Sequence, residues 1–308
     1  MLCQTPVIFF IFRRPLLTKQ VFEAIRAARP SKLLVVADGP RDTEDVIACK
    51  QARSITEEID WKCEVSRNYS EVNLGCRERV SSGLTWAFSQ VEEAIILEDD
   101  CLPNPSFFCF CQSLLAYYRD DERIWTISGN NFQDGIRRSS SSYFFSKYPF
   151  IWGWATWRRA WQNYDTHLEK WSENMLRKVV QSVCEDPDEQ EFRFKRFHDV
   201  VSGEIDAWDP KWSFTCWANN ALCAIPETNL VSNIGFGSQA THTTNRKFPY
   251  ANLKAGELKE ICHPAHIFRD IAADQYFYDN FFGGYSRKES RTLKFKVKNK
   301  MKKYLSLR

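Results

Sequence analysis

The sequence has no long hydrophobic run, no strong net charge and no visible secretory signal peptide. Its apolar segment from 6 to 12 is much shorter than the roughly 20 residues that a membrane-spanning helix needs. The formal net charge of +3 on 308 residues gives no reason to expect a general nucleic-acid binder. We therefore expect a cytoplasmic protein that neither crosses a membrane nor binds nucleic acid.

The sequence also lacks closely paired cysteines, although it contains eleven of them. No C-x-x-C pair occurs, and the nearest approach is Cys109 with Cys111, which are separated by one residue. This spacing, together with the odd number and the length of the chain, argues against a structural zinc site and against a disulfide scaffold. We expect mostly buried free thiols in a reducing compartment.

Hydrophobic and aromatic residues, in contrast, are abundant. The chain is 44% hydrophobic and 26% charged, which is enough for a large core and a well-solvated surface. Aromatic residues make up 15% of the chain and include eleven tryptophans. This content favours a site that stacks against flat rings or sugar faces.

Basic residues are concentrated at the end of the chain. Residues 287–308 contain ten Lys or Arg and one Glu, a local charge of +9, so the remainder carries 3 − 9 = −6. We interpret 286–308 as a basic tail that makes peripheral contact with an anionic membrane surface at its inner face. A solvated end without a partner is the alternative.

Strand and helix patterns alternate along the first 118 residues. Apolar runs predict strands at 7–12, 32–37, 61–66 and 94–97, and helical periodicity predicts helices at 18–28, 42–59, 73–88 and 105–118. Further helices are expected within 169–201 and at 213–224. Such alternation predicts an α/β fold with a mostly parallel, Rossmann-like sheet flanked by helices. In sheets of this kind, ligands bind beyond the carboxyl ends of the strands.

Three consecutive acids, Glu98, Asp99 and Asp100, follow the predicted strand at 94–97. Neighbouring carboxylates repel one another, so placing them together is costly without a cation. A hard divalent ion held by one or two carboxylates and by phosphate oxygens removes that repulsion. The alternative is an acidic turn that leads into a helix, where carboxylates favour the helix N-terminus.

Several motifs occur in an order that resembles the GT-A nucleotide-sugar glycosyltransferases, in particular a bacterial family 2-like branch. They also resemble the Golgi N-acetylglucosaminyltransferase that begins complex N-glycans. The motifs lie at 36–41, 73–76, 97–103, 152–157, 208–212 and 229–235, so the resemblance covers most of 5–245. It implies one GT-A domain at 1–285, with a nucleotide-binding half at about 1–130 and an acceptor half at about 131–285.

The resemblance also implies roles for individual residues. Asp100 and His242 are expected at the metal, where Mn²⁺ or Mg²⁺ is the implied cofactor. The implied donor-binding residues are Asp99 at the ribose, Glu98 at the donor sugar, Asp38 at the nucleoside and Arg14 at the base or phosphate. Three of these residues have a structural alternative: a turn-forming role for Asp38, a surface position for Arg14 and ordinary packing for His242.

Asp209, in a Trp-Asp-Pro sequence, is the expected catalytic base, with Glu204 and Asp206 as rivals. A carboxylate that removes a proton from an acceptor hydroxyl contributes about 10²–10⁴-fold to a rate. If Asp209 has this role, the reaction inverts the anomeric configuration. An ordinary Asp-Pro turn is the alternative. The acceptor is expected to stack on Trp152, Trp154 and Trp208, although tryptophans most often pack in a core.

These expectations amount to a metal-dependent enzyme that transfers a sugar from a nucleoside diphosphate donor to a hydroxyl. The donor is expected to be a UDP-sugar and the acceptor a glycan or a lipid-linked glycan, in the setting of surface polysaccharide or lipopolysaccharide synthesis. One alternative is a non-catalytic sugar-binding or scaffold protein. Another is a nucleotidyltransferase, which we disfavour because 12–17 lacks the glycine-rich loop that holds a triphosphate.

Overall fold

The computed structural model describes residues 3–165, 168–236, 250–251, 253–284 and 287. His242 and almost all of the basic tail lie outside the described residues. No helix in the part of the chain that the structure describes is long and apolar enough to cross a membrane. All eleven cysteines are described, all are free thiols, and most of them are buried.

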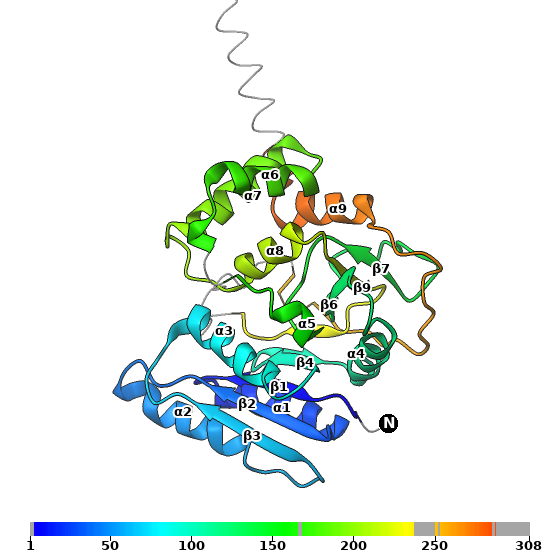
Figure 1. The fold of residues 1–308 in the computed structure, drawn as a ribbon. Coiled ribbons are helices and arrows are strands. Elements are labelled where there is room, and N and C mark those ends of the chain that lie inside the picture. Colours follow the sequence, from blue (N-terminus) through cyan, green and yellow to red (C-terminus); the bar gives the residue numbers. More distant parts are fainter. Residues whose placement is uncertain (1–2, 166–167, 237–249, 252, 285–286, 288–308) are drawn as a thin grey trace, which may run out of the picture.

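Four strands and three helices alternate in the first hundred residues, as expected (Figure 1). Three of the strands, β1, β2 and β4, are apolar and mostly buried, which is typical of a parallel sheet covered on both faces, whereas the edge strand β3 is polar and partly exposed. Along the chain the elements are β1 (Val7–Ile11), α1 (Pro15–Ala28), β2 (Lys32–Ala37), α2 (Thr43–Ile55), β3 (Glu64–Tyr69), α3 (Gly75–Phe88) and β4 (Glu93–Glu98).

The second part of the chain adds short strands and a group of helices. In order these are β5 (Cys101–Pro103), α4 (Pro105–Tyr117), β6 (Ile124–Ser128), β7 (Tyr143–Ser146), β8 (Trp154–Trp157), α5 (Arg158–Trp161), α6 (Glu173–Val183), α7 (Pro187–Val201), α8 (Asp209–Ala218), β9 (Leu222–Pro226), β10 (Val231–Asn233) and α9 (Ile271–Phe281). A short 3₁₀ turn at Leu168–Lys170 precedes α6.

Within the described residues, eight strands form one sheet in the order β3-β2-β1-β4-β8-β6-β9-β7. Strands β3, β2, β1 and β4 are mutually parallel, whereas β8 runs antiparallel to both β4 and β6, and β7 runs antiparallel to β9. The α/β fold with a large sheet flanked by helices is thus confirmed. The antiparallel strands were not expected.

The order in which strands are added to the sheet reverses at β1: β2 and β3 are added on one side of it and β4 on the other. Strand β1 lies between β2, which follows it in sequence, and β4, which enters on its other side. The carboxyl ends of β1 and β4 therefore lie next to each other at a topological switch point. In open α/β sheets such a point is the usual place for a ligand.

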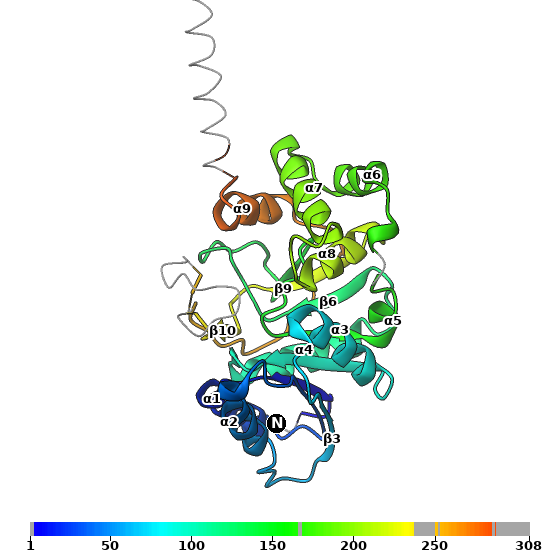
Figure 2. The ribbon, with the colours of Figure 1, turned by 90° about the vertical axis from the view of Figure 1, so that its left-hand side faces the viewer.

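Alternate residues of each central strand enter two separate cores. On one face of β1, Ile8 and Phe10 pack in a cluster with α3, α5 and α8, which also contains most of the tryptophans. On the other face, Val7, Phe9 and Ile11 pack with α1, α2 and α4. Helices consequently cover both faces of the sheet (Figure 2).

Several predicted elements have different bounds in the structure: the helix predicted at 42–59 ends at Ile55, and the strand predicted at 61–66 is Glu64–Tyr69. The helix expected from 18 begins instead at Pro15, because a proline at the first helical position loses no hydrogen bond. The helix expected at 213–224 is α8, which begins at Asp209 for the same reason and ends at Ala218. Its predicted last turns form β9, whose apolar residues are buried between β6 and β7.

Candidate active site

Arg14 and the acidic residues meet because the first and fourth strands are neighbours. Arg14 immediately precedes α1 beyond the end of β1, and Asp99 and Asp100 follow β4. One guanidinium nitrogen of Arg14 bonds Asp100 Oδ2 at 2.9 Å, and the other forms a short ion pair with Asp99 Oδ1. The backbone N–H of Phe12 also donates to Asp99, at 3.3 Å. The surface alternative for Arg14 is therefore wrong.

Burial and mutual repulsion govern the electrostatics of the three acids. Burial raises the pKa of Glu98 to about 8, and the Asp100 carboxylate contributes to the rise. Burial also raises the pKa of Asp99 to about 6, although Arg14 partly offsets the rise. The same acids raise the pKa of Arg14. The cluster thus has more carboxylates than cations, since one guanidinium faces three acids.

A second, two-stranded sheet holds Asp100 in place. Strand β10 pairs antiparallel with β5, and the N–H of Ile234 donates to the backbone oxygen of Asp100 at 2.8 Å. Gly235 then passes so close that a Cβ atom there would collide with the Asp100 carboxylate. This close approach explains why the 229–235 motif ends in glycine.

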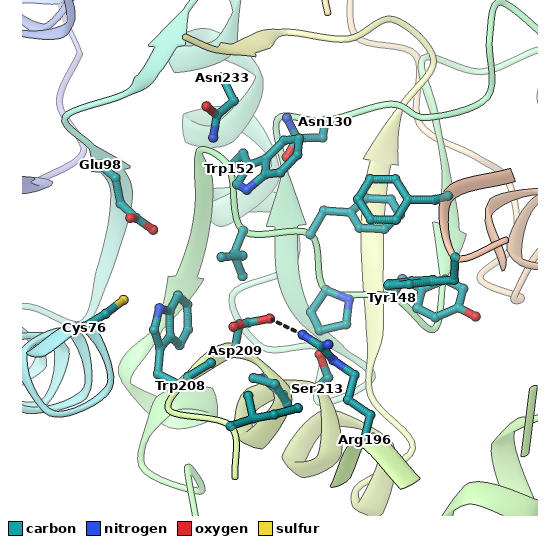
Figure 3. Close-up of a pocket in the computed structure, with 18 of the residues that line it drawn as sticks. Cys76, Glu98, Asn130, Tyr148, Trp152, Arg196, Trp208, Asp209, Ser213 and Asn233 are labelled. Carbon is teal, nitrogen blue, oxygen red and sulfur yellow. Dashed lines mark ion pairs between the residues drawn. The ribbon is translucent and has the colours of Figure 1, made fainter. Parts of the chain in front are cut away.

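A cavity of about 730 Å³ opens beside these acids. This volume lies within the range of about 300–1,000 Å³ that small-molecule sites occupy. Figure 3 shows Glu98 directed into it from one side, and Trp208 and Asp209 facing it from another. The lining includes five acids and three arginines, namely Glu98, Asp100, Glu204, Asp206, Asp209, Arg14, Arg193 and Arg196. The rest is largely aromatic.

The candidate base Asp209 lies at the first position of α8. Its carboxylate Oδ2 is 4.0 Å from an Arg196 nitrogen, and its side chain is 37% exposed. Its rival Asp206 forms a closer ion pair, at 2.9 Å, with Arg77 of α3. Glu204, the second rival, is exposed. All three carboxylates line the cavity.

Two of the three expected acceptor tryptophans line the cavity. Trp152 and Trp208 contribute to its wall, whereas Trp154 does not. Trp154 lies in β8, is 1% exposed and packs between Trp208 and Trp212, with ring centroids 5.8 and 5.9 Å away. Any effect of Trp154 on a ligand is therefore indirect, through the position of Trp208.

Asp38 has a local role at the start of α3 and does not line the cavity. Its carboxylate accepts hydrogen bonds from the backbone N–H groups of Gly39, Leu74 and Gly75 and from the side chain of Asn73. These four bonds use the lone-pair positions of an ionised carboxylate. Asp38 thus caps α3 from the end of β2, and contact with a nucleoside stays a prediction.

The carboxylate oxygens at the cavity wall are suitable ligands for a divalent cation whose remaining ligands are substrate phosphates. Among the described residues, no group of three or more His, Cys, Asp or Glu side chains is arranged to hold a metal. Glu98 and Asp100 nevertheless supply carboxylate oxygens at the cavity wall. Mg²⁺ typically binds to one or two carboxylates and to substrate phosphates. The predicted ligand His242 lies outside the described residues.

Comparisons with known proteins identify no family for this chain. No known family matches the sequence, and no curated protein matches it. Many solved structures do match. One is a 4-diphosphocytidyl-2C-methyl-D-erythritol synthase from Anaerococcus prevotii, with 7% identity and a TM-score of 0.34, covering 72% of this chain and 88% of that one.

Two further solved structures have the same TM-score of 0.34. A cytidylyltransferase from Leptospira borgpetersenii is 10% identical and covers 65% of this chain and 74% of its own. A UDP-glucose pyrophosphorylase complexed with UDP-glucose is 11% identical and covers 72% and 90%. All three are nucleotidyltransferases by name, the class that the sequence disfavoured. At this TM-score they carry no argument about this chain, and the likeness to GT-A glycosyltransferases stays unconfirmed.

The arginines of α7 were not among the predicted site residues. Arg193 and Arg196 both line the cavity, from one face of that helix. Their spacing of three residues and the position of Glu189 four residues before Arg193 were readable as one helical face. No sequence signal, however, indicated that this face lines the same cavity as the acids at the end of β4, because the two parts lie about a hundred residues apart in the sequence.

Proposed function

We propose that this protein transfers a sugar from a nucleoside diphosphate donor to a hydroxyl acceptor. The observation that carries the proposal is the joint position of Glu98, Asp100 and Asp209 around one cavity beyond the ends of β1 and β4. The volume of about 730 Å³ suits a nucleotide sugar, and Trp152 and Trp208 offer flat faces for sugar rings. In this proposal 1–130 binds mainly the nucleotide and 131–285 mainly the acceptor.

The donor side has one cation and three acids with which to position a diphosphate. Asp100, with Glu98 beside it, would hold Mn²⁺ or Mg²⁺ together with the diphosphate oxygens. Such an ion stabilises the charge that develops on the leaving diphosphate. Arg14 fixes the orientation of Asp99 and Asp100, and it supplies a second positive charge near the same place.

On the acceptor side, Asp209 removes the hydroxyl proton as the oxygen attacks the anomeric carbon. The new bond joins that carbon to the acceptor oxygen, and the bond to the diphosphate oxygen breaks. The nucleoside diphosphate leaves with the bonding electrons, and the proton stays on the carboxylate. Attack opposite the leaving group inverts the anomeric configuration. Arg196, 4.0 Å from Asp209, stabilises the carboxylate before proton transfer.

Turnover of a panel of nucleoside diphosphate sugars by the purified chain tests the proposal. Release of nucleoside diphosphate is measured with Mn²⁺, with Mg²⁺ and with a chelator, in the presence of mixed glycan acceptors. Asp209→Asn should lower turnover about 10²–10⁴-fold while donor binding persists. Turnover within tenfold of the parent would remove Asp209 from the base role, and Asp206→Asn would be tested next.

Nucleotidyl transfer, the alternative left open by the sequence, is separated from sugar transfer by the same assay. It would release pyrophosphate from a nucleoside triphosphate and a sugar phosphate. The loop after β1 argues against it, because 12–17 has no glycine and Arg14 is already paired with Asp99 and Asp100. Pyrophosphate release without nucleoside diphosphate would nevertheless decide for it. Tight donor binding with neither product would favour the non-catalytic scaffold.

A further inference from the structure

Arg193 of α7 is a buried arginine, and two of its three guanidinium nitrogens have no hydrogen-bond acceptor in the described part of the chain. Its side chain is 6% exposed, and it forms part of the cavity wall. No acceptor among the described residues bonds its Nε or Nη2 atoms. Burying a charged donor without an acceptor is costly, so an arginine in this state needs a reason.

The nearest carboxylate does not supply the missing acceptor. Glu189, one turn earlier on α7, has one oxygen 2.9 Å from the Lys147 ammonium, and its other oxygen accepts a short hydrogen bond from the Tyr148 hydroxyl. The Nε atom of Arg193 lies 3.8 Å from that second oxygen, beyond hydrogen-bond distance. Lys147 and Arg193 thus share the Glu189 carboxylate, and Lys147 lies within hydrogen-bond distance of it whereas the Nε atom of Arg193 does not.

Aromatic rings hold the guanidinium of Arg193 in place without using its N–H groups. Its central carbon lies 4.1 Å from the ring centroid of Phe282, 4.8 Å from that of Tyr148 and 5.5 Å from that of Trp217. Stacking of this kind stabilises the cation through its faces. These ring contacts supply no acceptor to the Nε and Nη2 atoms.

A second arginine reaches the same cavity from the same helix. Arg196 follows Arg193 by three residues, a spacing that places both side chains on one side of α7. Burial lowers the pKa of Arg196, and the charge of Arg193 lowers it further, whereas Asp209 opposes the shift. Figure 3 shows Arg196 directed toward Asp209. Two guanidinium groups that repel each other, one of them unsatisfied, favour an anion between or beside them.

We propose that Arg193 and Arg196 form a subsite for an oxyanion on the acceptor, a carboxylate or phosphate carried by a sugar. The planar fork of an arginine matches such groups bidentately, and the neighbouring aromatic side chains Phe150, Trp152 and Phe277 offer apolar surface to the sugar ring. An anion held at Arg196 would place the acceptor beside Asp209. The assignment rests on the proposed transferase function, because it names the acceptor of that reaction as an anionic sugar.

Calorimetric titration of the full chain with matched sugars tests the subsite without any turnover. The probes are p-nitrophenyl glucuronide against p-nitrophenyl glucoside for a carboxylate, and glucose 6-phosphate against glucose for a phosphate. In one of the two pairs, the anionic probe should bind at least tenfold more tightly than its neutral partner. That preference should disappear in Arg193→Met, which keeps apolar bulk among the rings and removes the charge.

Two controls separate a binding role from a purely structural one. Arg177→Met removes an arginine that stacks on Phe194, at 3.5 Å, outside the cavity, and it should leave the preference unchanged. Arg193→Met should unfold in denaturant at the same concentration as the parent or a higher one, because the free protein loses unsatisfied donors. If Arg193→Met does not fold, Arg193→Lys replaces it and should lose most of the preference with the fork.

Each outcome bears on a different claim. Equal affinity for the anionic and neutral members of both pairs would overturn the subsite, as would a preference that survives in folded Arg193→Met. The turnover assay is independent of this result. A sugar transferase without an anion preference would keep the proposed function and lose the subsite, whereas anion binding without turnover of any donor would remove the proposed function alone.

Discussion

Arg14 has the position that a cation needs in order to stabilise the acidic cluster. It is only 14% exposed and touches Asp99 and Asp100, and the neighbouring Glu98 has a raised pKa. A metal ion that binds with the substrate is one way to neutralise such a cluster. In this chain the Arg14 guanidinium already neutralises part of its charge, so Asp99 and Asp100 can lie side by side in the protein without a metal.

Replacing Arg14 by methionine should make the metal-free protein markedly less stable. The change leaves two adjacent carboxylates without their partner, and breaking a buried ion pair from one side costs about 3 kcal/mol or more. Denaturant unfolding in a chelator measures the loss in the free energy of unfolding. Added Mn²⁺ should recover part of it in Arg14→Met and less in the parent, since a divalent ion then replaces the missing charge. An unchanged unfolding midpoint in chelator would contradict this account.

At the scale of elements, the start of α3 depends on a side chain from another strand. Leu74, the residue before the helix, cannot cap it, and Gly75 has a left-handed φ of 78°. Asp38 supplies the cap from the end of β2. The helix then carries Arg77, whose ion pair with Asp206 reaches the cavity wall. Asp38 therefore affects the site through the position of α3.

Asp38→Ala should reduce the free energy of unfolding by roughly 3 kcal/mol, because it removes several charge-assisted hydrogen bonds at once. Asp42→Ala is the matched control. Asp42 is the ordinary N-cap of α2, where its carboxylate accepts from Glu44 and Asp45, so its loss should cost about 1 kcal/mol. Chemical denaturation of both variants gives the comparison. Equal losses would show that Asp38 is no more than a common cap.

The elements that the sequence predicted correctly are those with a strong local signal. Strands β1 and β2 are continuous apolar runs that end at proline or at an Asp-Gly turn, and β2 has the predicted bounds. The acids after β4 were placed correctly for the same reason. Strands β8 and β9 were missed because their pairing joins distant segments: β8 pairs antiparallel with β4 and β6, and β9 pairs antiparallel with β7 and parallel with β6. Arg193 was missed because its lack of hydrogen-bond acceptors for Nε and Nη2 is a property of the folded structure and cannot be read from the sequence.

At the scale of the whole molecule, the cavity lies where two parts of the chain meet. One wall comes from the carboxyl ends of β1 and β4, and the opposite wall comes from α7, α8 and the segment before β8 (Figure 3). The first wall supplies Glu98, Asp100 and Arg14, whereas the second combines two arginines and three acids with aromatic rings. A ligand that spans both would have a diphosphate at one end and an anionic or flat group at the other, which suits a donor and an acceptor bound side by side.

The charge of the whole chain is also divided, and we expect the basic tail to bind anionic membranes. A truncation after Arg287 removes nine Lys or Arg and one Glu, a net charge of +8. It keeps Arg287, which stacks on Phe192 at 3.8 Å. Each basic residue near an anionic surface contributes about 1 kcal/mol, so the full chain should sediment with phosphatidylserine vesicles and the truncated chain should not.

Salt and lipid composition provide the controls for that experiment. Binding of the full chain should weaken steeply at about 0.5 M salt, because surface charges are then screened within a few ångströms. Neutral phosphatidylcholine vesicles should bind neither form. Sugar-transfer activity on a water-soluble acceptor should be the same for both forms, since the cavity wall contains no residue beyond 282 among those described. Equal sedimentation of the two forms with phosphatidylserine vesicles would refute the membrane role of the tail, because any binding would then come from residues before 288.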